Sequence, residues 1–159
     1  MHVDLLFRDA QPVDLPELSW TGGPAHCNAL AQTLADSCQG GVEFLVAEVN
    51  GLRLIAHGVV DFRPIAGVGL LRLLIVDAAW RGLGVGRALI EELEARAVAR
   101  GLTETQLMVE LDNPAAEAVY EHLGYRQAGT AVDSWPTDGG GIVRVPVRVL
   151  SRRHFHPAR

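Results

Sequence analysis

A glycine-rich turn, placed between an apolar run and a helix-forming stretch, limits this chain to a narrow set of folds. Residues 68–76 are almost continuously apolar, which is typical of a strand buried on both faces. Residues 84–100 carry apolar side chains at helical spacing, with acids early, arginines late and Gly101 as a C-terminal cap. The turn between them reads Arg81-Gly-Leu-Gly-Val-Gly86. The segment therefore predicts a strand that leads directly into a helix.

A turn of this kind can bind phosphate. Gly82, Gly84 and Gly86 remove side chains where the backbone N–H groups of a helix start point outward and the helix dipole favours an anion. Arg81 and Arg87 flank the turn and can add charge-assisted hydrogen bonds. The glycines alone are equally well explained by a tight connection that binds no ligand.

Two common phosphate-binding motifs do not fit the turn. The P-loop requires Gly-Lys followed by Ser or Thr, and the chain contains no Lys. The dinucleotide fingerprint requires Gly-x-Gly-x-x-Gly. Counted from Gly82 its last position is Arg87, and counted from Gly84 it is Leu89. Neither a P-loop nor a dinucleotide fold is expected.

The rest of the chain predicts a mixed α/β sheet. Asn50-Gly51 between two apolar runs indicates a hairpin, because both residues tolerate positive φ. Three strands in a meander followed by strand–helix alternation indicate one mixed sheet. The expected strands are residues 3–7, 42–49, 52–62, 68–76, 103–111, 125–132 and 141–150. The other expected elements are helices at 26–38, 84–100 and 113–124, a helix or turn at 12–20 with Asp14 as N-cap, and a polar loop at 134–140.

Length and hydropathy indicate one domain outside the membrane. A chain of 159 residues fits a single domain, expected over residues 1–150, with 151–159 as a flexible tail. No run approaches the roughly 18 apolar residues that a membrane helix requires. The first residues lack the apolar stretch and cleavage site of a signal peptide. We therefore expect a cytoplasmic protein.

Charge and cysteine content exclude other classes of partner. The net charge of −5 argues against a nucleic-acid binder and slightly favours cationic small substrates. Cys27 and Cys38 are too few for a disulfide framework or a zinc site, so reduced thiols are expected. His154 and His156 have no acid or cysteine nearby and are expected to be solvated. The sequence predicts no metal site.

At this point the sequence resembles a known family. Arg81-x-x-Gly84-x-Gly86 after an apolar strand is similar to the central Arg/Gln-x-x-Gly-x-Gly/Ala motif of the GNAT N-acetyltransferase superfamily. A second motif of that superfamily is similar to the spacing of Leu107, Val109, Asn113, Ala116, Tyr120, Gly124 and Tyr125. The resemblance covers about residues 5–130. It implies an α/β (α+β) fold with a mixed, mostly antiparallel sheet of about seven strands, helices on both faces, and a splay between strands four and five.

The resemblance also implies a co-substrate, acetyl-CoA, and direct acetyl transfer to the amine of a small molecule or peptide. The backbone of residues 81–87 would bind the pyrophosphate, and the strand edge at residues 74–76 would pair with the pantetheine arm. The Val76 N–H would donate to the thioester carbonyl as that oxygen gains negative charge. The implied cofactor-binding residues are Leu74, Ile75, Val76, Arg81, Gly82, Leu83, Gly84, Val85, Gly86, Arg87, Asn113, Ala116 and Tyr120.

Tyr120 is the implied general acid for the departing coenzyme A thiolate. A phenol with a pKa of about 10 can donate toward a thiolate whose acid has a pKa of about 8.5, if it is positioned to do so. A helical wheel places Ala115, Val119 and Leu123 in the buried stripe with Tyr120 at its edge, so a half-buried packing role stays open. Asn113 is expected to be a helix N-cap and, by resemblance, also to bind the coenzyme.

The general base is left open. Relatives place an acid at the positions of Arg72 or Met108, and this chain has neither. Glu110, His57, Asp61 and water remain as candidates. Because both acids are missing, a catalytically silent acyl-CoA-binding sensor or interaction module is the alternative function.

Two further predictions concern the acceptor pocket and the quaternary state. Trp20, His26 and Trp135 lie in expected loops that can wall an acceptor pocket. The last strand, residues 141–150, is a candidate edge strand for pairing with a second chain, which would give a homodimer.

Overall fold

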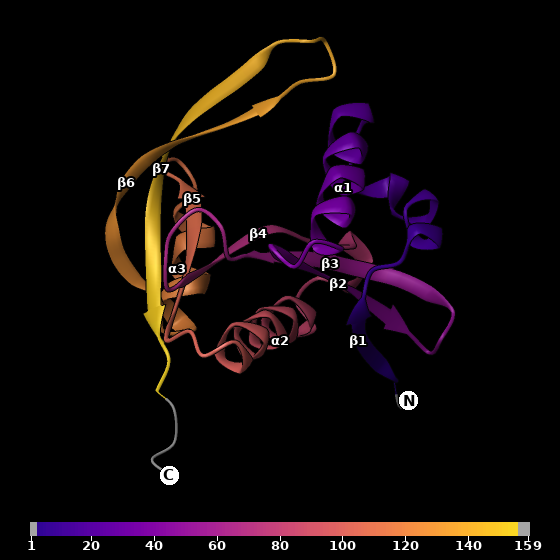
Figure 1. The fold of residues 1–159 in the computed structure, drawn as a ribbon, viewed down its shortest axis with the longest axis horizontal. Coiled ribbons are helices and arrows are strands. Elements are labelled where there is room, and N and C mark those ends of the chain that lie inside the picture. Colours follow the sequence, from indigo (N-terminus) through magenta and orange to yellow (C-terminus); the bar gives the residue numbers. More distant parts are fainter. Residues whose placement is uncertain (1–2, 156–159) are drawn as a thin grey trace.

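A computed structural model describes residues 3–155 and contains one seven-stranded sheet of order β1-β2-β3-β4-β5-β7-β6 (Figure 1). All neighbouring strands are antiparallel except β4 and β5. The strands are β1 Leu5–Asp9, β2 Val42–Val49, β3 Arg53–Asp61, β4 Val68–Val76, β5 Glu104–Glu110, β6 Arg126–Pro136 and β7 Ile142–Arg153. The helices are α1 Pro24–Ser37, α2 Val85–Ala99 and α3 Pro114–His122, with 3₁₀ helices at Pro12–Asp14, Pro16–Thr21 and Ala78–Trp80. The predicted fold class is confirmed.

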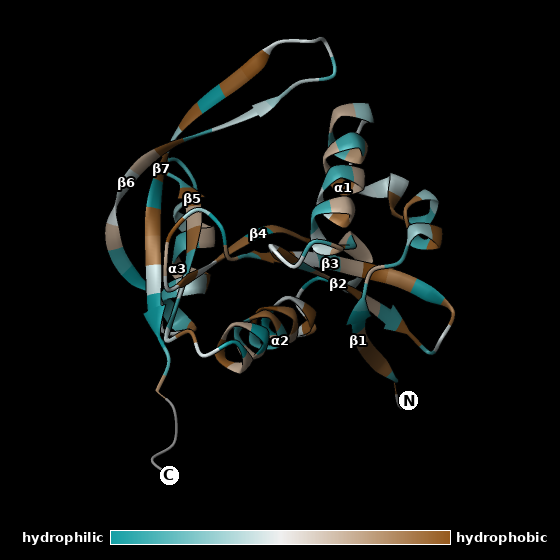
Figure 2. Ribbon diagram, viewed as in Figure 1, coloured by the Kyte–Doolittle hydropathy of each residue, from teal (hydrophilic) through white to brown (hydrophobic). Residues whose placement is uncertain are grey.

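The core lies on both faces of the sheet. Figure 2 shows hydrophobic residues, in brown, along the central strands. On one face, α2 packs Leu89, Leu93 and Ala97 against the sheet. On the other face, Leu30 and Leu34 of α1 do the same. Period-two alternation in β2 and β3 supplies apolar side chains to both layers, which is why most residues of these strands are buried.

The sheet opens between β4 and β5, as expected. The two strands pair only at residues 68–70 and 104–106 and then diverge. The pairing of β4 with β3 is irregular between His57 and Val59, and Leu73 opposite this bulge has φ 53°. A left-handed backbone is costly for a branched residue, and such strain concentrates at functional sites. Because β4 pairs with β5 only as far as residue 70, the β4 edge at residues 71–76 has no strand partner on the β5 side.

Two expectations about the C-terminal part are wrong. Strand β7 lies between β5 and β6, so residues 141–150 do not form an edge; the edges are β1 and β6. The expected tail from residue 151 belongs to β7 as far as Arg153, because all of β5 pairs with residues 147–153 of β7. His154 is also ordered, with its N–H donating to Thr103 O at 2.7 Å. His156 lies outside the described residues.

Smaller corrections concern loops and caps. Strand β6 continues through Pro136, so the connection to β7 is shorter than the expected loop. Asp14 is not the N-cap residue; Gln11 holds that position, and the Asp14 side chain accepts from its N–H. It is buried at the end of a 3₁₀ helix and accepts hydrogen bonds from the Arg8 guanidinium and the Gln11 N–H. Burial beside Arg8 makes this carboxylate a structural residue.

A buried polar cluster joins α2, β5 and β7. Glu94 of α2 is only 5% exposed. Its carboxylate accepts hydrogen bonds from the Tyr125 phenol at 2.7 Å and from Arg152 at 3.0 and 3.1 Å. Thr105 Oγ1 lies 2.9 Å from the Tyr125 hydroxyl and 2.7 Å from His154 Nε2. The prediction that His154 is solvated is therefore wrong, since this side chain is 11% exposed.

Among residues 3–155, no helix has the length and apolar character needed to cross a membrane. The same residues contain no group of three or more His, Cys, Asp or Glu side chains arranged to hold a metal ion. Cys27 and Cys38 are both free thiols.

Candidate active site

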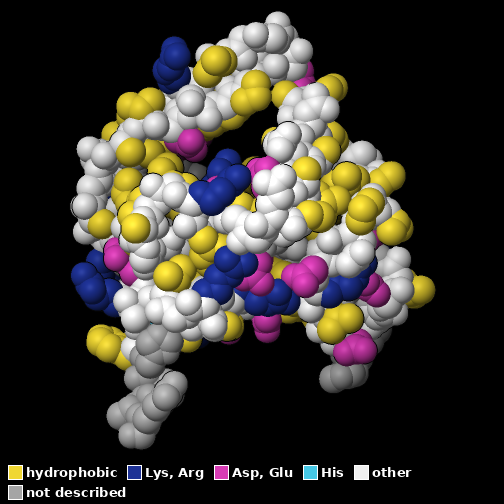
Figure 3. All heavy atoms as spheres, viewed as in Figure 1, with side chains coloured by type: hydrophobic (Ala, Val, Ile, Leu, Met, Phe, Trp, Pro, Cys, Tyr) yellow, Lys and Arg dark blue, Asp and Glu magenta, His cyan; other side chains and the backbone are white. Residues whose placement is uncertain are grey.

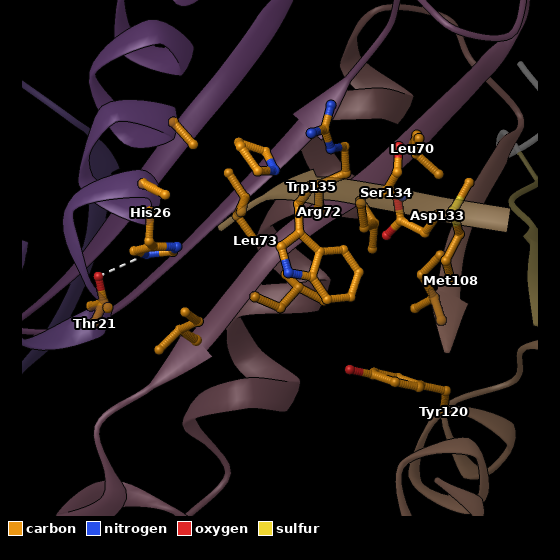
Figure 4. A pocket seen from close by; sticks show the side chains of 18 residues that line it. Thr21, His26, Leu70, Arg72, Leu73, Met108, Tyr120, Asp133, Ser134 and Trp135 are labelled. Atoms are coloured by element: carbon orange, nitrogen blue, oxygen red, sulfur yellow. Dashed lines mark hydrogen bonds between the residues drawn. The ribbon is translucent and has the colours of Figure 1, made fainter. Parts of the chain in front are cut away.

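Two cavities meet in the splay between β4 and β5, and Leu74 and Tyr120 border both of them. The first cavity has a volume of about 760 Å³ and lies between β4, α1 and β6 (Figure 4). It is lined by Thr21, Gly22, Ala25, His26, Ala29, residues 70–75, Leu107, Met108, Tyr120 and residues 133–136. The second has a volume of about 550 Å³ and lies between β4, α2 and α3. It is lined by Leu74, Val76, Gly86, Arg87, Leu89, Ile90, residues 118–120, His122 and Leu123.

The connection between β6 and β7 covers the first cavity. This hairpin extends beyond the sheet, and Figure 3 shows the molecule hollowed beneath it. Asp138 in the connection accepts a hydrogen bond from the Ala25 N–H at the start of α1, at 2.7 Å. The first cavity is therefore bounded by segments more than 100 residues apart in the sequence.

The glycine turn forms an open helix start beside the second cavity. Gly82 and Gly84 have φ values of 76° and 85°, which only glycine adopts without cost. Gly84 is the N-cap of α2 and provides no side-chain cap. The first bond back into the helix runs from the Ala88 N–H to Gly84 O, at 3.0 Å. The N–H groups of residues 85–87 thus have no partner within the helix and are available to an anion.

The two arginines of the turn differ in their contacts. Arg81 Nε donates to Val76 O at 3.2 Å, which holds this side chain against the end of β4. Arg87 Nε donates to Glu91 one helical turn later, at 3.0 Å, and its side chain is 64% exposed. Arg87 lines the second cavity and is free to reorient, since exposed ion pairs of this kind hold weakly.

The backbone of Val76 presents a donor to the splay. The next residue, Asp77, donates its N–H to Ile55 O of β3 at 2.7 Å. Successive residues of a strand direct their N–H groups to opposite edges. The Val76 N–H therefore points away from β3, toward the unpaired edge of β4 where the second cavity lies.

Tyr120 stands at the junction of the two cavities. Figure 4 shows its hydroxyl directed into the first cavity, and within residues 3–155 no group forms a hydrogen bond with it. Burial raises the pKa of this phenol, so it keeps its proton at neutral pH. The side chain can therefore act as a proton donor to a group bound between Leu74 and α3.

The predicted cap of α3 is confirmed, whereas the predicted buried stripe is wrong. Asn113 Oδ1 accepts from the Ala116 N–H at 3.2 Å. The core-facing residues are Ala116, Tyr120 and Leu123, while Val119 is 58% exposed and borders the second cavity. Of the predicted stripe, Leu123 packs against the core, whereas Ala115 and Val119 are exposed and Ala116 and Tyr120 take their place.

The structure brings part of the predicted cofactor set together. Leu74, Ile75, Val76, Gly86, Arg87 and Tyr120 line one or both cavities. Residues 81–85 form the adjoining turn without lining either cavity, and Asn113 and Ala116 form the first turn of α3.

The model of the acetyltransferase (GNAT) family matches residues 11–125, well over half of the chain. The chain belongs to the GNAT family. This match includes β4, the glycine turn, α2 and α3, which surround the second cavity, but not β6, which lines the first.

Solved acetyltransferases share the fold of this GNAT protein. The ribosomal-protein-S18-alanine N-acetyltransferase from Escherichia coli is 23% identical with a TM-score of 0.73, over 98% of this chain and 97% of that one. The PaiA N-acetyltransferase from Thermoplasma acidophilum, solved in complex with coenzyme A, is 18% identical with a TM-score of 0.69, over 97% and 100%. The spermidine/spermine N-acetyltransferase SpeG from Vibrio cholerae is 19% identical with a TM-score of 0.72, over 94% and 92%.

None of the three side chains that the sequence offered as a general base lines either cavity. His57 is fully buried, Asp61 is buried and bound to Arg63, and Glu110 is exposed at the end of β5. Instead, His26 and Asp133 line the first cavity. His26 lies in the first turn of α1, with Nε2 2.9 Å from Thr21 Oγ1. Burial lowers its pKa, so the imidazole is neutral at pH 7.

Of the three residues expected to wall an acceptor pocket, His26 and Trp135 line the first cavity and Trp20 lines neither cavity. His26 belongs to a helix rather than a loop, because α1 begins at Pro24. No sequence pattern pointed to Asp133, since its place depends on the bend of β6 over the cavity.

His57 lies directly behind this wall. Its ring stacks on that of His26 with centroids 5.6 Å apart, and neither of its ring nitrogens has a hydrogen-bond partner in the described part of the chain. Burial lowers the pKa of His57 to about 4, and the neighbouring His26 contributes to the shift. A neutral imidazole with unpaired nitrogens is therefore held in the core at neutral pH.

This histidine should make the folded state sensitive to acid. The unfolded chain takes up a proton below a pKa of about 6.5, whereas the folded chain does so only near pH 4. Stability is therefore complete above pH 6.5 and falls between pH 6.5 and 4. We expect His57 to account for a loss of about 2 kcal/mol between pH 7 and pH 5.

Denaturant unfolding at both pH values checks this expectation. His57→Leu should remove most of that pH dependence, while His122→Gln, at an exposed site on α3, should leave it unchanged. An equal loss of stability in wild type and His57→Leu would show that other groups cause it.

Proposed function

We propose that this GNAT protein uses acetyl-CoA as a co-substrate and transfers its acetyl group directly to an amine. The observation that carries the proposal is the pair of cavities that meet at Leu74 and Tyr120. The second cavity adjoins the open helix start and suits the coenzyme. The first adjoins neutral and charged polar side chains and suits the acceptor.

Each group has a role in such a transfer. Acetyl-CoA supplies an acyl group activated as a thioester. The N–H groups of residues 85–87 bind the pyrophosphate, and the Val76 N–H stabilises negative charge on the thioester oxygen during attack. The amine forms its bond to the acyl carbon as the carbon–sulfur bond breaks, and Tyr120 gives its proton to the sulfur. The proton that the attacking nitrogen releases passes to water or to the neutral imidazole of His26, which lines the first cavity, and solvent returns a proton to Tyr120.

The similar structures support an amine acceptor. Their names specify a ribosomal-protein alanine in one case and spermidine or spermine in another. These acceptors differ in size and charge, so for this chain they support only the reaction class. A silent coenzyme-binding module is disfavoured by Tyr120, whose unpaired hydroxyl lies where the two cavities meet.

Binding of acetyl-CoA is the first test. At a concentration one hundred times its Kd, acetyl-CoA should raise the free energy of unfolding by about 2.7 kcal/mol. Gly84→Val should abolish most of this gain, because a branched residue cannot hold φ 85° and the helix start would change its path. The gain is measured for each variant as the difference in thermal unfolding with and without acetyl-CoA.

The matched control is Gly139→Ala, at a glycine with open space around it in the β6–β7 connection. It should keep the full gain. No stabilisation of the wild type at millimolar acetyl-CoA would contradict the proposed function.

A further inference from the structure

Arg72 of β4 borders the first cavity with most of its hydrogen-bonding capacity unused. Its side chain is 49% exposed and lines the cavity wall, as Figure 4 shows. Nη1 donates to Asp61 Oδ2 at 3.2 Å. Among residues 3–155, no partner is found for its Nε or Nη2. A guanidinium has five N–H donors in a planar fork, so this one can bind a second acceptor group.

Asp61 orients Arg72 but accepts a hydrogen bond from only one of its nitrogens. The Asp61 carboxylate already accepts from Arg63 Nε and Nη2, both at 3.0 Å, and from the Arg63 N–H. Its negative charge is thus divided between two guanidinium groups. Because Asp61 is buried and bound to Arg63, it holds Arg72 at Nη1, and it leaves Nε and Nη2 of this cavity-lining residue available to another acceptor.

The remaining charge in this cavity is small. Besides Arg72, the only charged side chain among its described lining residues is Asp133, whose Oδ1 accepts from the Ser134 N–H at 2.9 Å. His26 is neutral, because burial lowers its pKa. One fixed cation and one anion suit a ligand that carries both charges, whereas a polyamine would bring a second cation toward Arg72.

The position of Arg72 sets the size of such a ligand. Arg72 precedes Leu74 by two residues, and a strand rises roughly 3.3 Å per residue. A group bound by Arg72 therefore lies within one small molecule's reach of the junction between Leu74 and Tyr120, where the amine must react. The distance fits the carboxylate of an amino acid or of a short peptide.

We propose that the acceptor carries a carboxylate in addition to its amine, and that Arg72 determines this specificity by binding it. The inference rests on the proposed function. The free edge of the guanidinium, Nε with Nη2, matches two carboxylate oxygens in a bidentate pair. The carboxylate belongs to a free amino acid or to the end or side chain of a peptide.

The test compares acceptors that differ only in the carboxylate. The pairs are phenylalanine with phenethylamine, lysine with cadaverine, and glycylglycine with its C-terminal amide. Thiol release from acetyl-CoA and mass spectrometry of the products give kcat/KM for each. We expect the carboxylate member to be favoured at least tenfold in one or more pairs, and the active pair identifies the source.

Variants assign the effect to Arg72. Arg72→Met should raise KM for the carboxylate acceptor about tenfold or more, with little change in kcat, in the KM for acetyl-CoA, or in the decarboxylated member. Arg72→Lys should restore part of the affinity, because it keeps the charge and loses the fork. Arg153→Met, at an exposed site on the far end of β7, should match the wild type.

The failures of the two proposals are distinguishable. If acetyl-CoA neither stabilises the protein nor releases thiol with any amine, the proposed function fails. If acetyl-CoA binds, the inference is overturned when every carboxylate acceptor is inactive, when the decarboxylated members react equally well, or when Arg72→Met affects both members alike.

Discussion

Replacing Tyr120 with phenylalanine is expected to lower kcat about 10²- to 10⁴-fold while leaving the affinity for acetyl-CoA nearly unchanged. The variant removes only the hydroxyl, which has no hydrogen-bond partner among the described residues, so the packing of the ring against Leu74 and Leu123 is retained. Without this donor the thiolate must leave unprotonated or take a proton from water. Burial raises the pKa of Tyr120 and keeps the donor protonated in the working pH range.

Single-turnover thiol release and calorimetric titration of acetyl-CoA separate the two quantities. Glu121→Gln is the matched control, since this residue is exposed next to Tyr120 on α3 and lines neither cavity. An unchanged kcat in Tyr120→Phe would assign Tyr120 to packing. A loss of coenzyme affinity equal to the loss of kcat would show that the hydroxyl holds the coenzyme rather than donating a proton.

The largest effect on stability is expected at Glu94. Glu94→Ala should lower the free energy of unfolding by roughly 3 kcal/mol, because partners of a buried carboxylate lose their charged acceptor. The Tyr125 phenol is fully buried and keeps only Thr105 as a partner. The Arg152 side chain is 37% exposed, so water can hydrate its guanidinium in the variant, which limits the loss of stability.

Denaturant unfolding at pH 7 measures this change. Glu94→Gln keeps one carbonyl acceptor for Tyr125 and should fall between wild type and Glu94→Ala. Glu92→Ala, at an exposed position on the same helix, should change stability by less than about 0.5 kcal/mol. A loss in Glu94→Ala no larger than this control would show that the cluster contributes nothing to folding.

For both Tyr120 and Glu94, the sequence predicted the helix that carries the residue but not the contacts of its side chain. Tyr120 was identified by the resemblance to the family's second motif, but its packing followed from how α3 lies over the splay. Glu94 belongs to a run of acids that resembles a solvated helix face. Its burial requires Tyr125 and Arg152, which lie 31 and 58 residues further along the chain.

The sequence by itself determined the features that depend on neighbouring residues. Gly82 and Gly84 adopt the positive φ values that open the start of α2, and Asn113 caps α3, because these conformations follow from the residue types in place. The family resemblance then supplied the mixed sheet and the splay between its fourth and fifth strands.

Only the tertiary structure decided which charged groups reach the cavities. The bulge at Leu73 arises from a register shift against β3, and Asp138 closes the first cavity by binding the start of α1. These contacts join segments far apart in the chain, and their outcome depends on packing rather than on local preference. For the same reason, the sequence shows only that Arg72 stands where relatives place an acid. The structure shows that Asp61 orients Arg72, and this contact makes Arg72 a candidate for binding a carboxylate.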